Sequence, residues 1–141
     1  MKNVKKITRL RLDKNGTDEF ILIGLVSAEP DYKISLAINK KLHISLKNSD
    51  PVKIDDGKTF SSFAATGTSG ITYTLISNRT DNDMLLGKFK NVDYVFVVHD
   101  PEKEMKTKDL VISFRQTEYI NAAFIMDPDS VKDKNFQYLI H

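Results

Sequence analysis

Cysteine and tryptophan are absent from this 141-residue chain. Without cysteine there can be no disulfide, no thiolate-bound metal and no cysteine nucleophile, and the composition suits a reducing cytosol. Long apolar runs are also missing, because none approaches the roughly 20 residues that a membrane-spanning helix needs. A signal peptide would need a continuous apolar stretch near the start of the chain, where Arg9 and Arg11 interrupt it. We therefore expect a cytoplasmic protein with no membrane partner.

An excess of charge of either sign is likewise missing. Lysine and arginine number 21 and aspartate and glutamate 19, so the net charge of +2 is too small to indicate a nucleic-acid partner. The basic residues between positions 2 and 14 are the sole support for nucleic-acid binding, and we expect none. The 40% hydrophobic and 28% charged content is that of a globular protein. The length favours one domain, spanning residues 1–141, with one ordinary core.

The first part of the chain predicts a hairpin over residues 6–27. Residues 7–12 alternate weakly between apolar and charged side chains, as a half-buried strand does, and an Asn-Gly pair supplies the turn. Residues 20–26 form an apolar run broken only by a glycine, which suits a central strand covered on both faces. A short buried helix at residues 18–27 stays open as an alternative, because periodicity does not separate the two.

Further stretches predict strands because they are rich in β-branched and aromatic residues and bounded by turn residues. A glycine-containing segment at residues 67–70 has the length of a hairpin loop. The polar residues 78–83 are expected to be exposed. The predicted strands are a short one within residues 43–58, followed by a loop, and strands at residues 60–66, 71–77, 92–98 and 120–126.

Proline positions and apolar periodicity predict two helices. Pro30 fits the first turn of one helix, where its missing N–H costs nothing, and apolar residues at three- and four-residue steps give this helix a buried stripe. Asp100 and Pro101 are expected to cap and begin a second helix. The apolar faces comprise Ile34, Ala37, Ile38 and Leu42 in the first helix, Leu110, Val111 and Phe114 in the second, and Phe136, Leu139 and Ile140 in a terminal turn that packs down.

The elements follow one another as strand pair, helix, run of strands, helix, strand and terminal turn. Runs of strands interrupted by few helices favour a mostly antiparallel sheet. We predict an α+β fold, a single two-layer domain with a mostly antiparallel sheet and two main helices packed on one face. Within it, residues 92–126 form a strand–helix–strand unit, whose crossover would be right-handed if both strands are parallel in one sheet.

Polar residues near two predicted strand ends are candidates for a binding site. Asp93 and Tyr94 could form a polar pair at the mouth of a pocket, although an aspartate in this place more often caps the preceding turn. Arg79 could hold a phosphate or carboxylate through two hydrogen bonds. The plainer interpretations of Arg79 are a solvated charge or an ion pair with nearby Asp81 or Asp83.

His99 could act as a general base beside a carboxylate or begin a metal site. It is one of three histidines, and none has a second ligand at metal spacing on a helix. We therefore expect no metal, no cofactor and no catalytic residue. A small-ligand-binding domain or minor enzyme with a pocket near His99, Asp93 and Arg79 is the alternative hypothesis. In a regular strand positions 93 and 99 share a face and position 94 points the other way, which argues against joint action.

Lysines mark the candidate binding surface. Lys33 and Lys40 lie seven residues apart and so share one flank of the first predicted helix. Such a flank is commonly a solvated surface, but it also suits an acidic partner. The whole candidate surface comprises Lys33, Lys40, Arg79, Lys88, Lys90, Asp93 and Tyr94.

One segment resembles the signature of a known bacterial family. Residues 86–94 read Leu-Gly-Lys-Phe-Lys-Asn-Val-Asp-Tyr, which is similar to the signature of the IPExxxVDY family. The Val-Asp-Tyr half is intact, whereas Leu-Gly-Lys replaces Ile-Pro-Glu. This change exchanges a stiff proline for a flexible glycine and inverts a charge. Other blocks that agree with the family in the same order are residues 20–25, 31–32, 38–40, 73–79 and 127–128.

The resemblance implies a compact cytosolic protein of no known activity. It also implies gene neighbours in fatty-acid synthesis and central metabolism, which would be a lead to partners. The missing catalytic set, together with a compact fold, makes a non-enzymatic protein-binding or adaptor domain our first hypothesis. An acidic partner such as acyl carrier protein is one example. The protein is expected to be a monomer, or a homodimer joined through an exposed strand edge.

Overall fold

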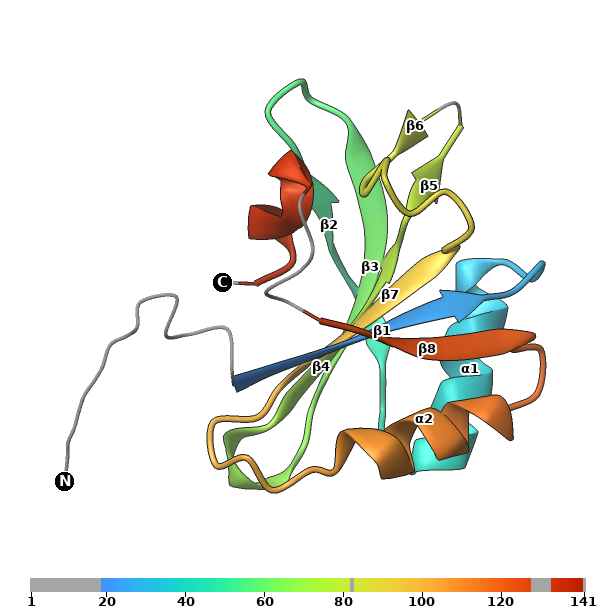
Figure 1. Cartoon of the computed structure of the whole chain (residues 1–141), viewed down its shortest axis with the longest axis vertical. Helices are drawn as coiled ribbons and strands as arrows, with labels where there is room; N and C mark the ends of the chain where they lie inside the picture. Colours follow the sequence, from blue (N-terminus) through green and yellow to red (C-terminus); the bar gives the residue numbers. More distant parts are fainter. Residues whose placement is uncertain (1–18, 82, 128–132, 141) are drawn as a thin grey trace, which may run out of the picture.

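The computed structural model describes residues 19–81, 83–127 and 133–140. In this part of the chain a six-stranded antiparallel sheet carries two α-helices, α1 (Asp31–Leu42) and α2 (Thr107–Arg115), as Figure 1 shows. The predicted α+β class is therefore confirmed. In order across the sheet, the strands are β2 (Lys47–Lys53), β3 (Thr59–Thr66), β4 (Thr72–Ser77), β7 (Tyr94–His99), β1 (Phe20–Val26) and β8 (Ala122–Met126). Shorter elements are η2 (Thr68–Gly70), β5 (Arg79–Thr80), β6 (Asp83–Met84) and η3 (Lys134–Tyr138).

β1 lies inside the sheet, between β7 and β8. Its continuous apolar sequence reflects cover on both faces, so the strand interpretation of residues 20–26 is confirmed and the helix alternative is wrong. β1 pairs with β7 on one side and with β8 on the other, and both strands come from the second half of the chain. The predicted hairpin partner of residues 20–26 is the stretch of residues 7–12. Residues 7–12 themselves, like the basic residues between positions 2 and 14, lie outside the described residues.

The two helices cover one face of the sheet. Ile34 and Ile38 from α1 and Phe114 from α2 are fully buried in a core that also contains Phe96 of β7. The Phe96 and Phe114 rings meet edge to face with their centroids 4.8 Å apart. This arrangement confirms the predicted apolar face of α2. On α1 it confirms Ile34, Ile38 and Leu42, whereas Ala37 is only half-buried and lies outside this core. Pro30 occupies the position before the first turn of α1 rather than starting the helix.

α2 begins later than predicted. Residues 101–106 form turns, and α2 starts at Thr107. Asp100 does not cap a helix, because its buried carboxylate accepts a hydrogen bond from the Met105 N–H at 2.7 Å. Lys103 has a φ of 54°, a left-handed conformation that a right-handed helix cannot contain.

The opposite face of the sheet carries a second apolar cluster. Phe60, Ile76 and Val97 of the sheet pack there against side chains of residues 85–92 and of the C-terminal turn. Leu139 is buried in this cluster, which confirms the predicted terminal turn. Figure 1 shows this turn on a different side of the sheet from α1 and α2.

The hairpin of β3 and β4 is confirmed, with η2 as its link. β7 and β8 both run antiparallel to β1, so they are parallel to each other in one sheet, with β1 between them. A strand–helix–strand unit of this kind needs the crossover that α2 supplies. The ends of β4, β7 and β1 that carry Ser77, Tyr94 and Leu25 consequently lie side by side.

Candidate functional site

Arg79 and Asp93 form an ion pair beside these strand ends. Arg79 Nε donates to Asp93 Oδ1 at 2.7 Å, and Arg79 Nη2 donates to the Lys90 carbonyl. The second carboxylate oxygen of Asp93 accepts the Ser27 N–H at 2.9 Å. Asp93 therefore ties the end of β1 to Arg79 instead of capping the preceding turn. Arg79 pairs with Asp93 and not with the nearer acidic residues that the sequence suggested.

Tyr94 fastens the loop between β1 and α1 to β7. Its hydroxyl donates to the Glu29 carbonyl. In the same loop, Ser27 Oγ accepts the Glu29 N–H at 3.1 Å and donates to the Tyr119 carbonyl at 2.6 Å. Burial raises the pKa of Tyr94 to about 12, with smaller contributions from the carboxylates of Asp31, Asp93 and Glu29. The phenol is therefore a neutral hydrogen-bond donor near pH 7 and has no role there as a base.

A pH dependence follows for Tyr94. Its pKa in the folded protein lies above the ordinary value of about 10, so its stabilisation is complete below pH 10 and is lost as the pH rises through 12. At pH 8 we expect Tyr94→Phe to lower the free energy of unfolding by about 1 kcal/mol, because one hydrogen bond is lost. Denaturant unfolding from pH 8 to pH 12 should show this difference shrinking above pH 10. A constant difference would contradict the assignment, and exposed Tyr32→Phe is the matched control.

Asn78 is a buried residue that sequence reasoning missed, since residues 78–83 were expected to be exposed. Its Nδ2 donates to the carbonyls of Phe89 at 3.2 Å and Val92 at 2.9 Å, and its Oδ1 accepts the Leu86 N–H at 2.7 Å. These bonds hold the segment of residues 85–92 against the sheet. An asparagine in a polar run gives no sign of this burial, because the same composition is typical of a surface turn.

The four lysines of the predicted binding surface lie in different surroundings. Lys33 Nζ lies 3.2 Å from Glu29 and 4.5 Å above the centre of the Tyr119 ring, so its charge is partly neutralised. The hydrogen bond with Glu29 raises the pKa of Lys33. Lys40 is exposed near the end of α1. The backbone of Lys88 donates to Asp133 at 3.3 Å, and Lys90 supplies its carbonyl to Arg79. Arg79, Asp93, Tyr94, Lys90 and Lys33 therefore lie in one connected group, whereas Lys40 lies apart.

A row of exposed residues on α1 is the second feature that sequence reasoning missed. Tyr32 is 62% exposed and Leu36 is 66% exposed. Residues four apart on a helix are neighbours on one face, so Tyr32, Leu36 and exposed Lys40 follow one another along α1. We call these three residues the α1 stripe. The sequence did contain a sign of this row, because Tyr32 and Leu36 are large apolar residues that lie outside the predicted buried face of the helix.

His99 lies at the opposite end of β7 from Asp93. It pairs with Phe20 of β1 and Thr72 of β4, and its ring stacks on Phe20 with the centroids 4.6 Å apart. Its Nε2 lies 2.9 Å from Glu19 Oε1. Asp93, Tyr94 and Arg79 therefore do not converge with His99 on one cavity.

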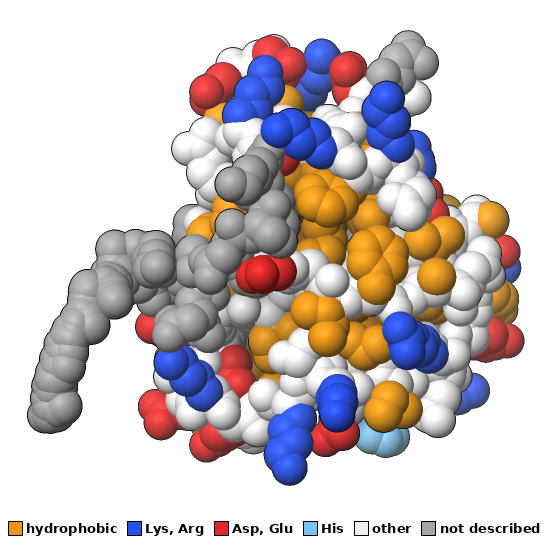
Figure 2. Space-filling view, in the orientation of Figure 1, with side chains coloured by type: hydrophobic (Ala, Val, Ile, Leu, Met, Phe, Trp, Pro, Cys, Tyr) orange, Lys and Arg blue, Asp and Glu red, His pale blue; other side chains and the backbone are white. Residues whose placement is uncertain are grey.

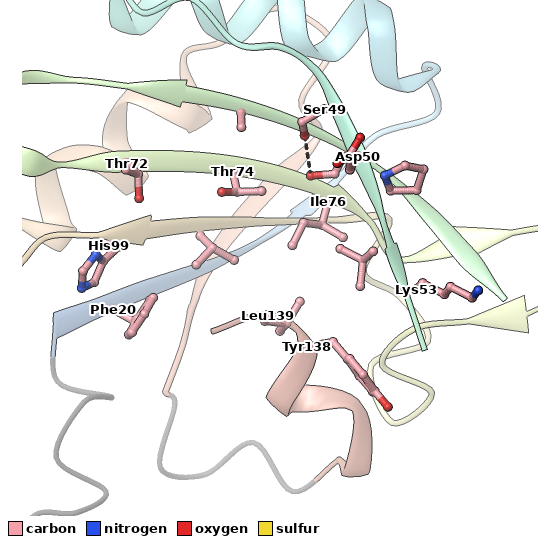
Figure 3. A pocket seen from close by; sticks show the side chains of 15 residues that line it. Phe20, Ser49, Asp50, Lys53, Thr72, Thr74, Ile76, His99, Tyr138 and Leu139 are labelled. Carbon is pink, nitrogen blue, oxygen red and sulfur yellow. Dashed lines mark hydrogen bonds between the residues drawn. The ribbon is translucent and has the colours of Figure 1, made fainter. Parts of the chain in front are cut away.

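His99 instead borders a cavity of about 510 Å³ on the sheet face opposite the helices. Figure 3 shows His99 and Phe20 at one end of the hollow, Lys53 and Tyr138 at the other, and Thr72 and Thr74 along the strands between them. The remaining lining residues shown in Figure 3 are Ser49, Asp50, Pro51, Val52, Ser62, Ala64, Ile76, Val97 and Leu139. Ser49, Ser62, Thr72 and Thr74 contribute hydroxyl groups to this lining, among apolar side chains such as Phe20, Ile76 and Val97.

Within residues 19–81, 83–127 and 133–140, no group of three or more histidines and carboxylates could hold a metal ion. Among the helices of these same segments, none has the length and apolar character needed to cross a membrane.

No family model, curated protein or solved structure matches this chain. The resemblance of residues 86–94 to the IPExxxVDY signature stays a prediction. In this chain the Val-Asp-Tyr residues serve the fold, since Val92 is buried, Asp93 holds Ser27 and Arg79, and Tyr94 holds the loop before α1. A side chain at Gly87 would meet nothing within 4 Å, so lack of space does not explain the glycine that replaces the proline of the signature.

Proposed function

We propose that this protein is a protein-binding domain that recognises its partner through the α1 stripe. The observation that carries the proposal is the exposure of Tyr32 and Leu36, at 62% and 66%, one helical turn apart. Single exposed apolar residues are ordinary on protein surfaces. A neighbouring tyrosine and leucine give a contiguous apolar contact, and tyrosine is enriched at the energetic centres of protein interfaces.

The partner that fits the α1 stripe has an apolar contact bordered by carboxylates. Lys40 and Lys41 are both exposed where the apolar part of the stripe ends. Opposite charges at the border of an apolar contact speed association and fix its orientation. An acidic protein of the acyl carrier protein kind has this chemistry. Lys33 is a weaker contributor, because Glu29 and Tyr119 already engage its ammonium group.

The polar side chains at the strand ends are already engaged within the fold, which favours binding through α1 over chemistry at Arg79, Asp93 and Tyr94. Arg79 and Asp93 use their hydrogen-bonding groups on each other, on Ser27 and on the Lys90 carbonyl. Tyr94 is held neutral by burial, which raises its pKa. A ligand would have to displace these contacts, and a group with satisfied hydrogen bonds gains little from exchanging them.

Capture from lysate of the source organism tests the proposal with a matched pair of variants. Leu36→Glu places a carboxylate in the α1 stripe, and Ile112→Glu makes the same change on α2, where Ile112 is 50% exposed. We expect the wild type and Ile112→Glu to capture one protein, with recovery by Leu36→Glu at least tenfold lower. A central interface residue contributes about 1.4 kcal/mol or more, which is a tenfold change in affinity.

Equal capture by all three proteins, or no specific capture by the wild type, would contradict recognition through the α1 stripe. The cavity beside His99 would then be the stronger candidate, as a site for a small ligand. The observation that favours it is its volume of about 510 Å³, which lies in the range of small-molecule sites.

A further inference from the structure

The two edges of the sheet are built differently. β2 carries Lys47, Pro51 and Lys53, and its pairing with β3 shifts register between Ser49 and Val52. Charges, proline and a bulge are the features that prevent an edge strand from pairing with another chain. This edge is therefore protected against association.

β8 forms the opposite edge and lacks these features. Its five residues are Ala-Ala-Phe-Ile-Met, with neither charge nor proline. Ile125 is 54% exposed. In the view of Figure 2, hydrophobic side chains gather in the middle of the face, where β8 runs in Figure 1, and charged side chains of both signs lie around them. Among the described strands, β1 alone pairs with β8.

The backbone of β8 presents a defined pair of residues at the edge that no other strand of the described part of the chain pairs with. The Val26 carbonyl of β1 points toward β8, since it accepts the Asn121 N–H at 2.8 Å, and the Leu25 carbonyl points away, since it accepts the Asp93 N–H. Successive residues of a strand direct their backbone N–H and C=O groups to opposite sides. Val26, Gly24 and Leu22 therefore face β8, and their partners Ala122, Phe124 and Met126 bond to β1. The remaining residues, Ala123 and Ile125, direct their N–H and C=O groups outward. Arg115 Nε donates to the Ala123 carbonyl at 3.2 Å, in agreement with this direction.

We propose that two copies of this chain associate by antiparallel pairing of their β8 strands, about a two-fold axis at Phe124. Such pairing places Ala123 of each copy opposite Ile125 of the other, so a large side chain lies beside a small one on the same face. Two-fold pairing is closed and extends the sheet through both copies without leading to a fibre. The Ala123 carbonyl has a second lone pair, so Arg115 can stay in place while an N–H from the other copy bonds there.

The dimer is expected to be weak. Stable dimers bury about 800 Å² on each partner, more than a five-residue strand junction supplies on its own. We therefore expect dimers to dominate only at protein concentrations on the order of 100 µM or above. The α1 stripe lies on a different element, so failure of the dimer would leave the partner-binding proposal standing, and the reverse also holds.

Single cysteines test this register directly, because the chain has none of its own. In the proposed pairing the two Phe124 positions face each other as a non-hydrogen-bonded pair, about 4.5 Å apart between Cα atoms, which a disulfide can span. The two Ala122 positions lie about 14 Å apart, four residues of rise along the strands, which a disulfide cannot span. On mild oxidation at 200 µM protein, we expect Phe124→Cys to give at least tenfold more covalent dimer than Ala122→Cys.

Sedimentation of the cysteine-free chain covers the case in which Phe124→Cys fails to fold. The wild type should show a dimer whose fraction rises with concentration, and Ile125→Lys, which charges an exposed edge position, should be monomeric at the same concentrations. A monomeric wild type at 500 µM, a dimer that Ile125→Lys leaves unchanged, or equal cross-linking of the two cysteine variants would overturn the proposal.

Discussion

Replacing Phe114 by alanine is expected to lower the free energy of unfolding by about 3–5 kcal/mol. Phe114 is fully buried and contacts Phe96 of the sheet edge to face, with ring centroids 4.8 Å apart. It is the largest buried side chain that α2 contributes to the core. Its removal leaves a cavity between α2 and the sheet that a nine-residue helix cannot close without moving.

Denaturant unfolding of Phe114→Ala, compared with Ile112→Ala, measures this effect. Ile112 lies two residues away on the same helix and is 50% exposed, so its replacement should change stability by less than about 0.5 kcal/mol. A loss at Phe114 within 1 kcal/mol of the control would mean that α2 does not pack on the sheet as described.

The second large effect is expected at Asn78. Asn78→Ala leaves the Leu86 N–H and the carbonyls of Phe89 and Val92 without their partner. Each buried group left unsatisfied costs about 1–3 kcal/mol, and partial entry of water reduces the sum, so we expect a total loss near 3 kcal/mol. Asn78→Asp should be at least as destabilising, because its carboxylate would face two carbonyl oxygens.

The matched control for Asn78 is Asn48→Ala on edge strand β2, where the asparagine is exposed. Chemical denaturation should show a change below about 0.5 kcal/mol for this control. If Asn78→Ala were equally mild, the segment of residues 85–92 would not depend on Asn78 for its attachment to the sheet.

The strands and helices that carry a strong local pattern were predictable from the sequence. The apolar run of residues 20–26 and the hairpin around residues 67–70 are examples, because strand periodicity and turn composition are properties of a short window. The partners of β1 were not predictable in this way, because β7 and β8 come from distant segments. The predicted start of the second helix failed for a related reason. Aspartate is a residue type that commonly caps helices, but the Asp100 carboxylate accepts a hydrogen bond from the Met105 N–H in the turn before α2.

In the candidate site, too, single residues were predictable from the sequence, whereas contacts between distant segments were not. Asp93 and Arg79 were singled out separately, yet their pairing spans fourteen residues and depends on the sheet bringing the two chain segments together. The sequence suggested Asp81 or Asp83 as the partner of Arg79, because these carboxylates are closer along the chain. The α1 stripe was missed because periodicity identifies the buried side of a helix, whereas the uncovered area of the other side depends on what packs around it.

Site-specific photo-cross-linking in the source organism tests the central claim most directly. A photoreactive amino acid at position 36 places the reactive group in the α1 stripe, and the same group at position 112 is the control on α2. The α1 stripe predicts a cross-link from position 36 to one protein with an acidic contact surface, and none to that protein from position 112. Cross-links that are equal at the two positions, or absent from position 36, would contradict partner recognition through α1.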